Sequence, residues 1–176
     1  MKKYLQVIPI IIYPYLLIPV LFIATLIDSK IKVFNYIINL YFIIIVIYTI
    51  ILLISKLKEM TAKEMVKVNF IIKMCQMPWF IFSFVLEFIG IIMGIFGVFI
   101  TVIFAFMNIF VRIITGIYSV GCIIKLKQEK VIGIPKTIFY SISSFVLIID
   151  FIISILMKFD VKGKEKEEEI NITNIE

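Results

Sequence analysis

The chain has 176 residues, of which 62% are hydrophobic and 17% are charged, and its formal net charge is +6. Soluble domains contain roughly 45–50% apolar residues, so this composition excludes an ordinary water-soluble protein. The sequence has no histidine, which is the commonest metal ligand and the usual general base at neutral pH. We therefore expect a protein that is not an enzyme, with no catalytic residues, no metal and no cofactor.

Apolar runs of about 20 residues recur along the chain, and a helix of that length crosses the hydrocarbon layer of roughly 30 Å. Membrane-spanning sheets would need short segments that alternate apolar and polar residues, and the sequence does not have this pattern. We predict an all-α, polytopic membrane protein whose single transmembrane domain covers residues 1–157. About five spans are expected, near residues 7–27, 34–54, 79–97, 102–124 and 137–157.

The first run, from Val7 to Ile27, is too long for the apolar h-region of a signal peptide and lacks a small-residue cleavage site, so we interpret it as a retained span. Pro9, Pro14 and Pro19 interrupt its hydrogen-bond ladder. The run is therefore bent, or its first part only enters the interface. A short polar break at residues 28–32 separates it from the second span.

The stretch from Ser55 to Met77 carries five lysines. Thr61 and Glu64 form a capping-box pattern, which is typical of a helix start. One interpretation is an amphipathic helix on an anionic leaflet, and the other is a basic loop that fixes the topology. Asn69 and Lys73 interrupt the apolar face, which favours the loop.

No polar break interrupts residues 78–124, a run that would be roughly 70 Å long as one helix. One membrane cannot contain that length. The run is therefore predicted to form two spans joined as a tight hairpin, with the turn near residues 97–102. Trp79 would anchor the start of the first of these spans at the interface.

Small and polar residues in this hairpin follow one another in steps of three and four, which places them on one helix face. Small residues on one face let membrane helices approach closely, and Gly90 with Gly94 forms a GxxxG pair. We expect the two spans to pack along this face. Its packing residues are Ser83, Gly90, Gly94, Gly97, Thr101, Ala105, Thr115 and Ser119.

Glu87, Arg112 and Asp150 are ionisable residues inside the predicted spans, where a lone charge costs at least ~2.5–3.5 kcal/mol. A hairpin centred near residues 99–100 puts Glu87 and Arg112 at similar depth, which predicts an ion pair. The depth of Asp150 in the fifth span also matches that of Arg112. Together with Asn108 these residues form the predicted charged cluster. It either fixes how the helices pair, which we favour, or binds an ion, a proton or an anionic group.

Residues 158–176 form a charged tail that is expected to be disordered. Basic loops stay in the cytoplasm, so five spans put the N-terminus in the cytoplasm and the C-terminus outside. If the proline-rich first run lies flat in the interface, four spans remain and the N-terminus is outside.

Three short motifs suggest a relationship. Gln76-Met77-Pro78 opens a span, Thr115-Gly116-Ile117-Tyr118 lies near the end of the next, and Asp150 follows later. With these motifs the chain resembles a family of small uncharacterised bacterial inner-membrane proteins with a domain of unknown function. The resemblance implies a bacterial plasma membrane and no known activity.

Two functions are consistent with these residues. The first is a non-enzymatic assembly or accessory subunit that contacts the lipid bilayer and a second copy or a larger membrane complex. The alternative is a small transporter or channel component that uses Glu87, Arg112 and Asp150 to bind an ion, a proton or an anion. Neither function involves nucleic acid.

Overall fold

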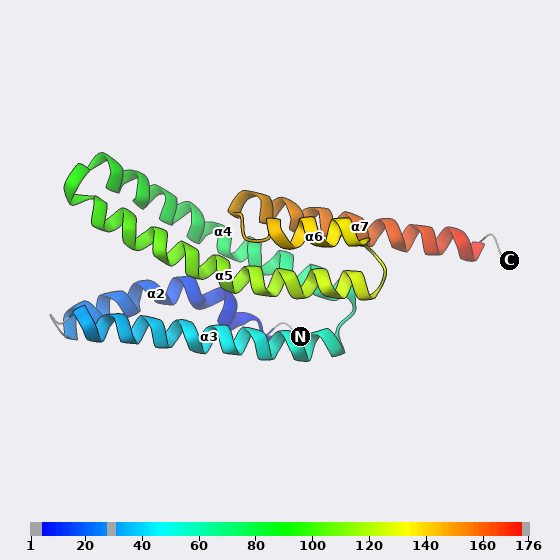
Figure 1. The fold of residues 1–176 in the computed structure, drawn as a ribbon, viewed down its shortest axis with the longest axis horizontal. Coiled ribbons are helices and arrows are strands. Elements are labelled where there is room, and N and C mark those ends of the chain that lie inside the picture. The colour runs from blue at the N-terminus through cyan, green and yellow to red at the C-terminus, as the bar shows by residue number, and fades with distance from the viewer. Residues whose placement is uncertain (1–4, 28–30, 174–176) are drawn as a thin grey trace. The chain divides into compact units, whose positions relative to one another are not determined.

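The computed structural model of the protein describes residues 5–27 and 31–173. These residues form six α-helices, one 3-10 helix and no strand, which confirms the all-α prediction. Residues 28–30 of the predicted polar break lie outside the described residues. The elements are α2 (Ile8–Ile27), α3 (Ile31–Glu59), α4 (Ala62–Ile92), η1 (Gly94–Phe96), α5 (Val98–Gln128), α6 (Ile134–Ser143) and α7 (Leu147–Thr173), as Figure 1 shows.

Three stretches are long and apolar enough to cross a membrane, namely Asn39–Glu59 in α3, Ala62–Ile92 and Val98–Gln128. Helix α2 adds a shorter apolar stretch, Ile8–Pro19. Large apolar side chains also cover the outer surface of the helices, where lipid is the only solvent that favours them. The chain is therefore a polytopic helical membrane protein.

The predicted hairpin is confirmed, because α4 and α5 run antiparallel and are joined by a short turn (Figure 1). The turn covers residues 93–97 and so comes earlier than the predicted turn at 97–102. Gly94 allows this, because its φ of 63° lies in the left-handed region that glycine adopts without strain. Each helix has 31 residues and is about 46 Å long, so its ends extend beyond the hydrocarbon layer.

The lysine-rich stretch from Ser55 to Met77 is helical apart from two residues between α3 and α4, and is not the loop that the sequence favoured. The capping box is confirmed, because the backbone N–H of Glu64 lies 3.4 Å from the Thr61 hydroxyl and the Thr61 N–H lies 3.3 Å from the Glu64 carboxylate. Met65 and Ile72 are fully buried on the apolar face of α4. Packing against protein outweighs the polar interruptions that had favoured a loop.

The predicted fifth span also differs from the structure. Residues 137–157 do not form one helix, since α6 ends at Ser143 and α7 begins at Leu147. Helix α7 then continues through the charged tail as far as Thr173, where the sequence predicted disorder. The tail forms contacts with other helix ends, and these contacts stabilise a helix that its composition alone does not favour.

The helices fall into two compact units. The first comprises Met1–Ile51 and Ile72–Thr115, and the second comprises Leu52–Ile71 and Gly116–Glu176. Each of α3, α4 and α5 therefore contributes one segment to each unit.

In the first unit, α2 packs against both α3 and α4. The rings of Tyr13 and Tyr41 stack with their centroids 5.3 Å apart, which joins α2 to α3. The hydroxyl of Tyr15 donates a hydrogen bond of 2.6 Å to the carbonyl of Cys75, which joins α2 to α4.

The core of the second unit lies along the last turns of α5. Tyr118, Cys122 and Leu126 are fully buried there, at the four-residue spacing of one helix face. The rings of Phe70 and Phe151 pack with their centroids 6.2 Å apart. The first turns of α4, the last turns of α5 and helix α7 therefore share one apolar core.

Candidate functional site

The side chain of Asn108 on α5 is the centre of a polar network in the hairpin. Its amide oxygen accepts hydrogen bonds from the indole N–H of Trp79 and the hydroxyl of Ser83, each at 3.1 Å. Its amide nitrogen donates to Oε1 of Glu87 at 2.6 Å. We call these four residues the Asn108 network. An asparagine suits the central position because one side chain both accepts and donates.

The three partners of Asn108 share one face of α4, because residues 79, 83 and 87 are spaced by four. Trp79 and Ser83 are almost fully buried. The prediction that Trp79 anchors a span at the interface is therefore wrong. Its ring packs against those of Tyr15 and Phe104 at centroid distances of 6.2 Å, so it belongs to the core of the first unit.

The closest backbone approach in the hairpin is between Gly90 and Gly97. A Cβ atom at Gly97 would overlap the carbonyl oxygen of Gly90. The Thr101 hydroxyl completes the contact, because it lies 3.3 Å from the Glu87 carbonyl and 3.2 Å from that of Gly97. Gly94 was predicted to lie on the same packing face as Gly90 in a GxxxG motif, but it forms the turn and a Cβ atom there would meet nothing within 4 Å.

The remaining predicted packing residues differ in their surroundings. Ala105 is half-buried. Thr115 is buried, and its hydroxyl donates to the Val111 carbonyl of its own helix at 3.0 Å. Ser119, in the second unit, is buried and donates to the side-chain oxygen of Asn69 at 3.1 Å. Only part of the predicted line of small residues therefore makes contacts between helices.

The predicted ion pair between Glu87 and Arg112 is absent from the part of the chain that the structure describes. The position of the turn explains this. Because the turn lies about five residues earlier than predicted, the Glu87 carboxylate meets Asn108, which lies one helical turn before Arg112 on α5. The Nε atom of Arg112 is buried and has no hydrogen-bond partner among the described residues.

Asp150, the third predicted ionisable residue, belongs to the second unit. It lies in the first turn of α7 and its side chain is buried. The structure therefore joins Glu87 with Asn108, places Arg112 one helical turn beyond Asn108 without an ion pair to Glu87, and puts Asp150 in a different unit.

One contact that ties α2 to α4 was not predicted from the sequence. Pro14 has no backbone N–H, so the carbonyl of Ile10, four residues earlier, loses its partner within the helix. The side-chain nitrogen of Gln76 donates to that carbonyl at 3.1 Å, and both residues are buried. The signal in the sequence was the proline itself, since a proline in the interior of a helix leaves a carbonyl that another group must satisfy.

A second polar cluster lies at helix ends in the second unit. Both carboxylate oxygens of Glu129 accept from the backbone N–H of Ala62, the first residue of α4, at 3.0 Å. The ammonium group of Lys125 donates to the carbonyl of Leu57, in the last turn of α3, at 2.9 Å. A carboxylate is favourable at a helix N-terminus and an ammonium group at a C-terminus. The last turn of α5 therefore caps both helices that meet at the α3–α4 turn.

A surface hollow of about 270 Å³ lies beside this cluster. Its two lysines are engaged, Lys63 in an ion pair with Glu165 at 2.7 Å and Lys164 with the backbone carbonyl of Glu129. Among the residues that the structure describes, no group of three or more Cys, Asp or Glu side chains is arranged to hold a metal ion. The hollow is lined by Thr61, Ala62, Lys63, Glu129, Val131, Val161, Lys164 and Glu165.

Fold and polar contacts together define a helical membrane protein with an internal polar network. Comparisons of the chain with known protein families, with characterised proteins and with solved structures find no match. Its function must therefore be argued from its own residues.

Proposed function

We propose that the protein is a non-enzymatic assembly or accessory subunit of a bacterial plasma-membrane complex, and that it pairs with another transmembrane helix through Glu87 and Arg112. One observation supports this. Glu87 and Arg112, the two charged residues between residues 78 and 124, do not form an ion pair with one another, although each lies in a helix long enough to cross the membrane.

The energetic case is clearest for Arg112. A guanidinium group inside hydrocarbon costs at least ~2.5–3.5 kcal/mol on insertion scales, and its Nε has no partner in the described chain. An acidic group from a neighbouring helix would remove most of that cost. The unsatisfied Nε of this half-buried arginine therefore favours a partner protein.

Glu87, on α4, also favours a partner protein. One of its carboxylate oxygens accepts from Asn108, and the residue as a whole is half-exposed. Around it, Phe84, Phe88 and Ile91 are 68%, 57% and 67% exposed, which is a surface made for lipid or for another helix. A carboxyl group on such a surface is stabilised when a partner covers it with a donor.

The Asn108 network favours assembly over transport. All hydrogen-bonding groups of the Asn108 amide except one N–H are used in contacts with α4, so its role is to hold the two helices together. A binding site for a transported ion would keep such groups available for the ion.

The test is purification from native membranes in a mild detergent, followed by native mass spectrometry. We expect the unmodified chain in a complex with another protein or a second copy. Glu87→Gln keeps an oxygen that accepts from Asn108 but removes the charge, and Arg112→Gln removes the cation. Both variants are expected as monomers with unchanged Trp79 fluorescence.

The matched control is Glu167→Gln, which removes an exposed charge on α7 and should leave the complex intact. A monomeric unmodified chain, or complexes that survive both hairpin substitutions, would contradict the proposal. Ion flux in proteoliposomes that Glu87→Gln abolishes would instead support the transporter.

A further inference from the structure

The segment predicted as span five consists of two helices that pack side by side. Helix α6 has ten residues and is about 15 Å long, half of the hydrocarbon thickness of roughly 30 Å. Lys136, in its first turn, forms an ion pair of 2.7 Å with Asp160, and Tyr140, one turn later, donates to the same carboxylate at 2.9 Å. Helix α7 therefore returns the chain to the level at which α6 began.

The charged part of α7 lies beside the loops at the basic end of the hairpin. Glu165 forms an ion pair of 2.7 Å with Lys63, which directly follows the α3–α4 turn. Lys164 donates to the carbonyl of Glu129, directly after α5. Glu129 in turn caps the N-terminus of α4. The tail therefore meets both loops that the sequence assigns to the cytoplasmic side.

The break between α6 and α7 leaves its backbone donors satisfied. The N–H of Ser144 donates to the carbonyl of Tyr140 at 3.0 Å, that of Phe145 to Ile142 at 3.4 Å, and that of Val146 to Ser143 at 3.1 Å. An irregular backbone is tolerated at membrane depth only when its polar groups find partners. The three N–H groups of this turn meet that requirement through acceptors in α6.

The outer face of α6 is apolar, and lysines surround its N-terminal end. Lys127, Lys130 and Lys136 are exposed at the end where the hairpin begins, where they match the anionic headgroups of the cytoplasmic leaflet. Acyl chains are therefore the occupants that fit the apolar face, with the lysines at headgroup level. The exposed apolar residues are Ile134, Ile138, Phe139, Ile142 and Phe145.

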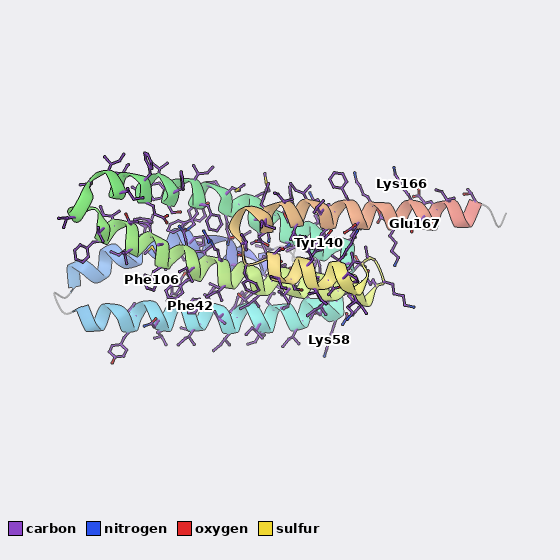
Figure 2. All side chains as sticks on the ribbon, turned by 45° about the horizontal axis from the view of Figure 1, so that its top comes forward. Phe42, Lys58, Phe106, Tyr140, Lys166 and Glu167 are labelled. Carbon is purple, nitrogen blue, oxygen red and sulfur yellow. The ribbon has the colours of Figure 1, made fainter. Side chains whose placement is uncertain are left out.

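We infer that α6 and the first half of α7 form a re-entrant hairpin, which enters the cytoplasmic leaflet and leaves it on the same side. The chain does not cross the membrane between residues 134 and 160. The charged part of α7, with Lys166 and Glu167 lying past the N-terminal end of α6 (Figure 2), then lies in the cytoplasm. This differs from the outside C-terminus expected from five spans. The inference does not depend on the proposed function.

Labelling with a membrane-impermeant maleimide tests which side the tail occupies. Single cysteines are introduced as Lys166→Cys in the tail, Lys127→Cys at the end of α5 and Ile95→Cys at the tip of the α4–α5 hairpin, after Cys75 and Cys122 are replaced by Ala. We expect Lys166→Cys and Lys127→Cys to react in inverted vesicles, and Ile95→Cys only in right-side-out vesicles. Reaction of Lys166→Cys together with Ile95→Cys would overturn the inference.

A second measurement tests whether the hairpin enters the membrane. A nitroxide spin label on Phe145→Cys should be accessible to lipid-soluble oxygen and shielded from a water-soluble nickel chelate. Exposure to the chelate would place the hairpin on the membrane surface and contradict re-entry.

A third measurement leaves residues 1–176 unchanged, so it applies even if the cysteine background does not fold. Reporters are fused after residue 176 of the natural chain. Fluorescence of a fused green fluorescent protein together with an inactive fused alkaline phosphatase is the expected result. The opposite pattern would contradict a cytoplasmic tail.

Discussion

Replacing Asn108 by Leu keeps the size of the side chain close to that of asparagine and removes every hydrogen bond of the Asn108 network. The three lost bonds all join α4 to α5. Hydrogen bonds between membrane helices average about 0.6 kcal/mol each and reach about 1.7 kcal/mol. The free energy of unfolding should therefore fall by about 2 kcal/mol, with an upper limit of about 5 kcal/mol.

The protein contains one tryptophan, and it is the partner of Asn108, so its fluorescence reports on this contact directly. Unfolding by sodium dodecyl sulfate in mixed micelles, followed through Trp79 emission, measures the change in stability. A loss of about 2 kcal/mol corresponds to roughly a 30-fold change in the unfolding equilibrium. The emission of the folded variant should also shift to shorter wavelength, because the indole N–H loses its acceptor.

Asn39→Leu is the control, because Asn39 is exposed on α3 and its replacement should change stability by less than about 0.5 kcal/mol. If Asn108→Leu unfolds within that same margin of the unmodified chain, the network does not hold the hairpin together. If Asn39→Leu costs as much as Asn108→Leu, the effect is not specific to the network.

Two further substitutions test the packing of the first unit by the same unfolding assay. Gln76→Leu leaves the buried carbonyl of Ile10 without a donor and should lower the free energy of unfolding by about 1–3 kcal/mol. Its control is Gln128→Leu, at an exposed position, which should leave that free energy unchanged. Equal effects of the two substitutions would contradict a role for Gln76. Gly97→Ala places a methyl group on a facing backbone carbonyl and should cost about 1–3 kcal/mol. The control for Gly97→Ala is Gly163→Ala, whose added methyl group meets nothing within 4 Å and should stabilise α7 by up to about 1 kcal/mol. If Gly97→Ala does not lower the free energy of unfolding, the contact between Gly90 and Gly97 is not tight.

The α4–α5 hairpin shows which features of the candidate site could be predicted from the sequence. Length and hydropathy required two antiparallel spans between residues 78 and 124, and α4 and α5 confirm them. The turn was misplaced by about five residues, because Gly94, Gly97 and Thr101 offered several positions for it and, of these three, only Gly94 adopts a positive φ. A shift of this size moves the partner of Glu87 along α5, which replaces the predicted Arg112 with Asn108.

The predictions of a disordered tail and of one continuous fifth helix differ from the structure for a related reason. An apolar run of about 20 residues has the length of a span whether it crosses the membrane or folds back halfway, so hydropathy cannot distinguish the two. The tail of α7 has the composition of a disordered segment, yet it forms ion pairs with residues distant in the sequence, such as Lys63.

The amino-acid sequence alone determined that this is an all-helical membrane protein with a central hairpin, because hydropathy and span length depend on composition and on neighbours along the chain. Tertiary structure alone decided which polar groups meet. It paired Asn108 with Trp79, Ser83 and Glu87, and it turned the last apolar run back on itself through Asp160. Inside an apolar solvent each buried donor needs an acceptor at hydrogen-bond distance, and a shift of one helical turn, about 5.4 Å, exchanges one partner for another.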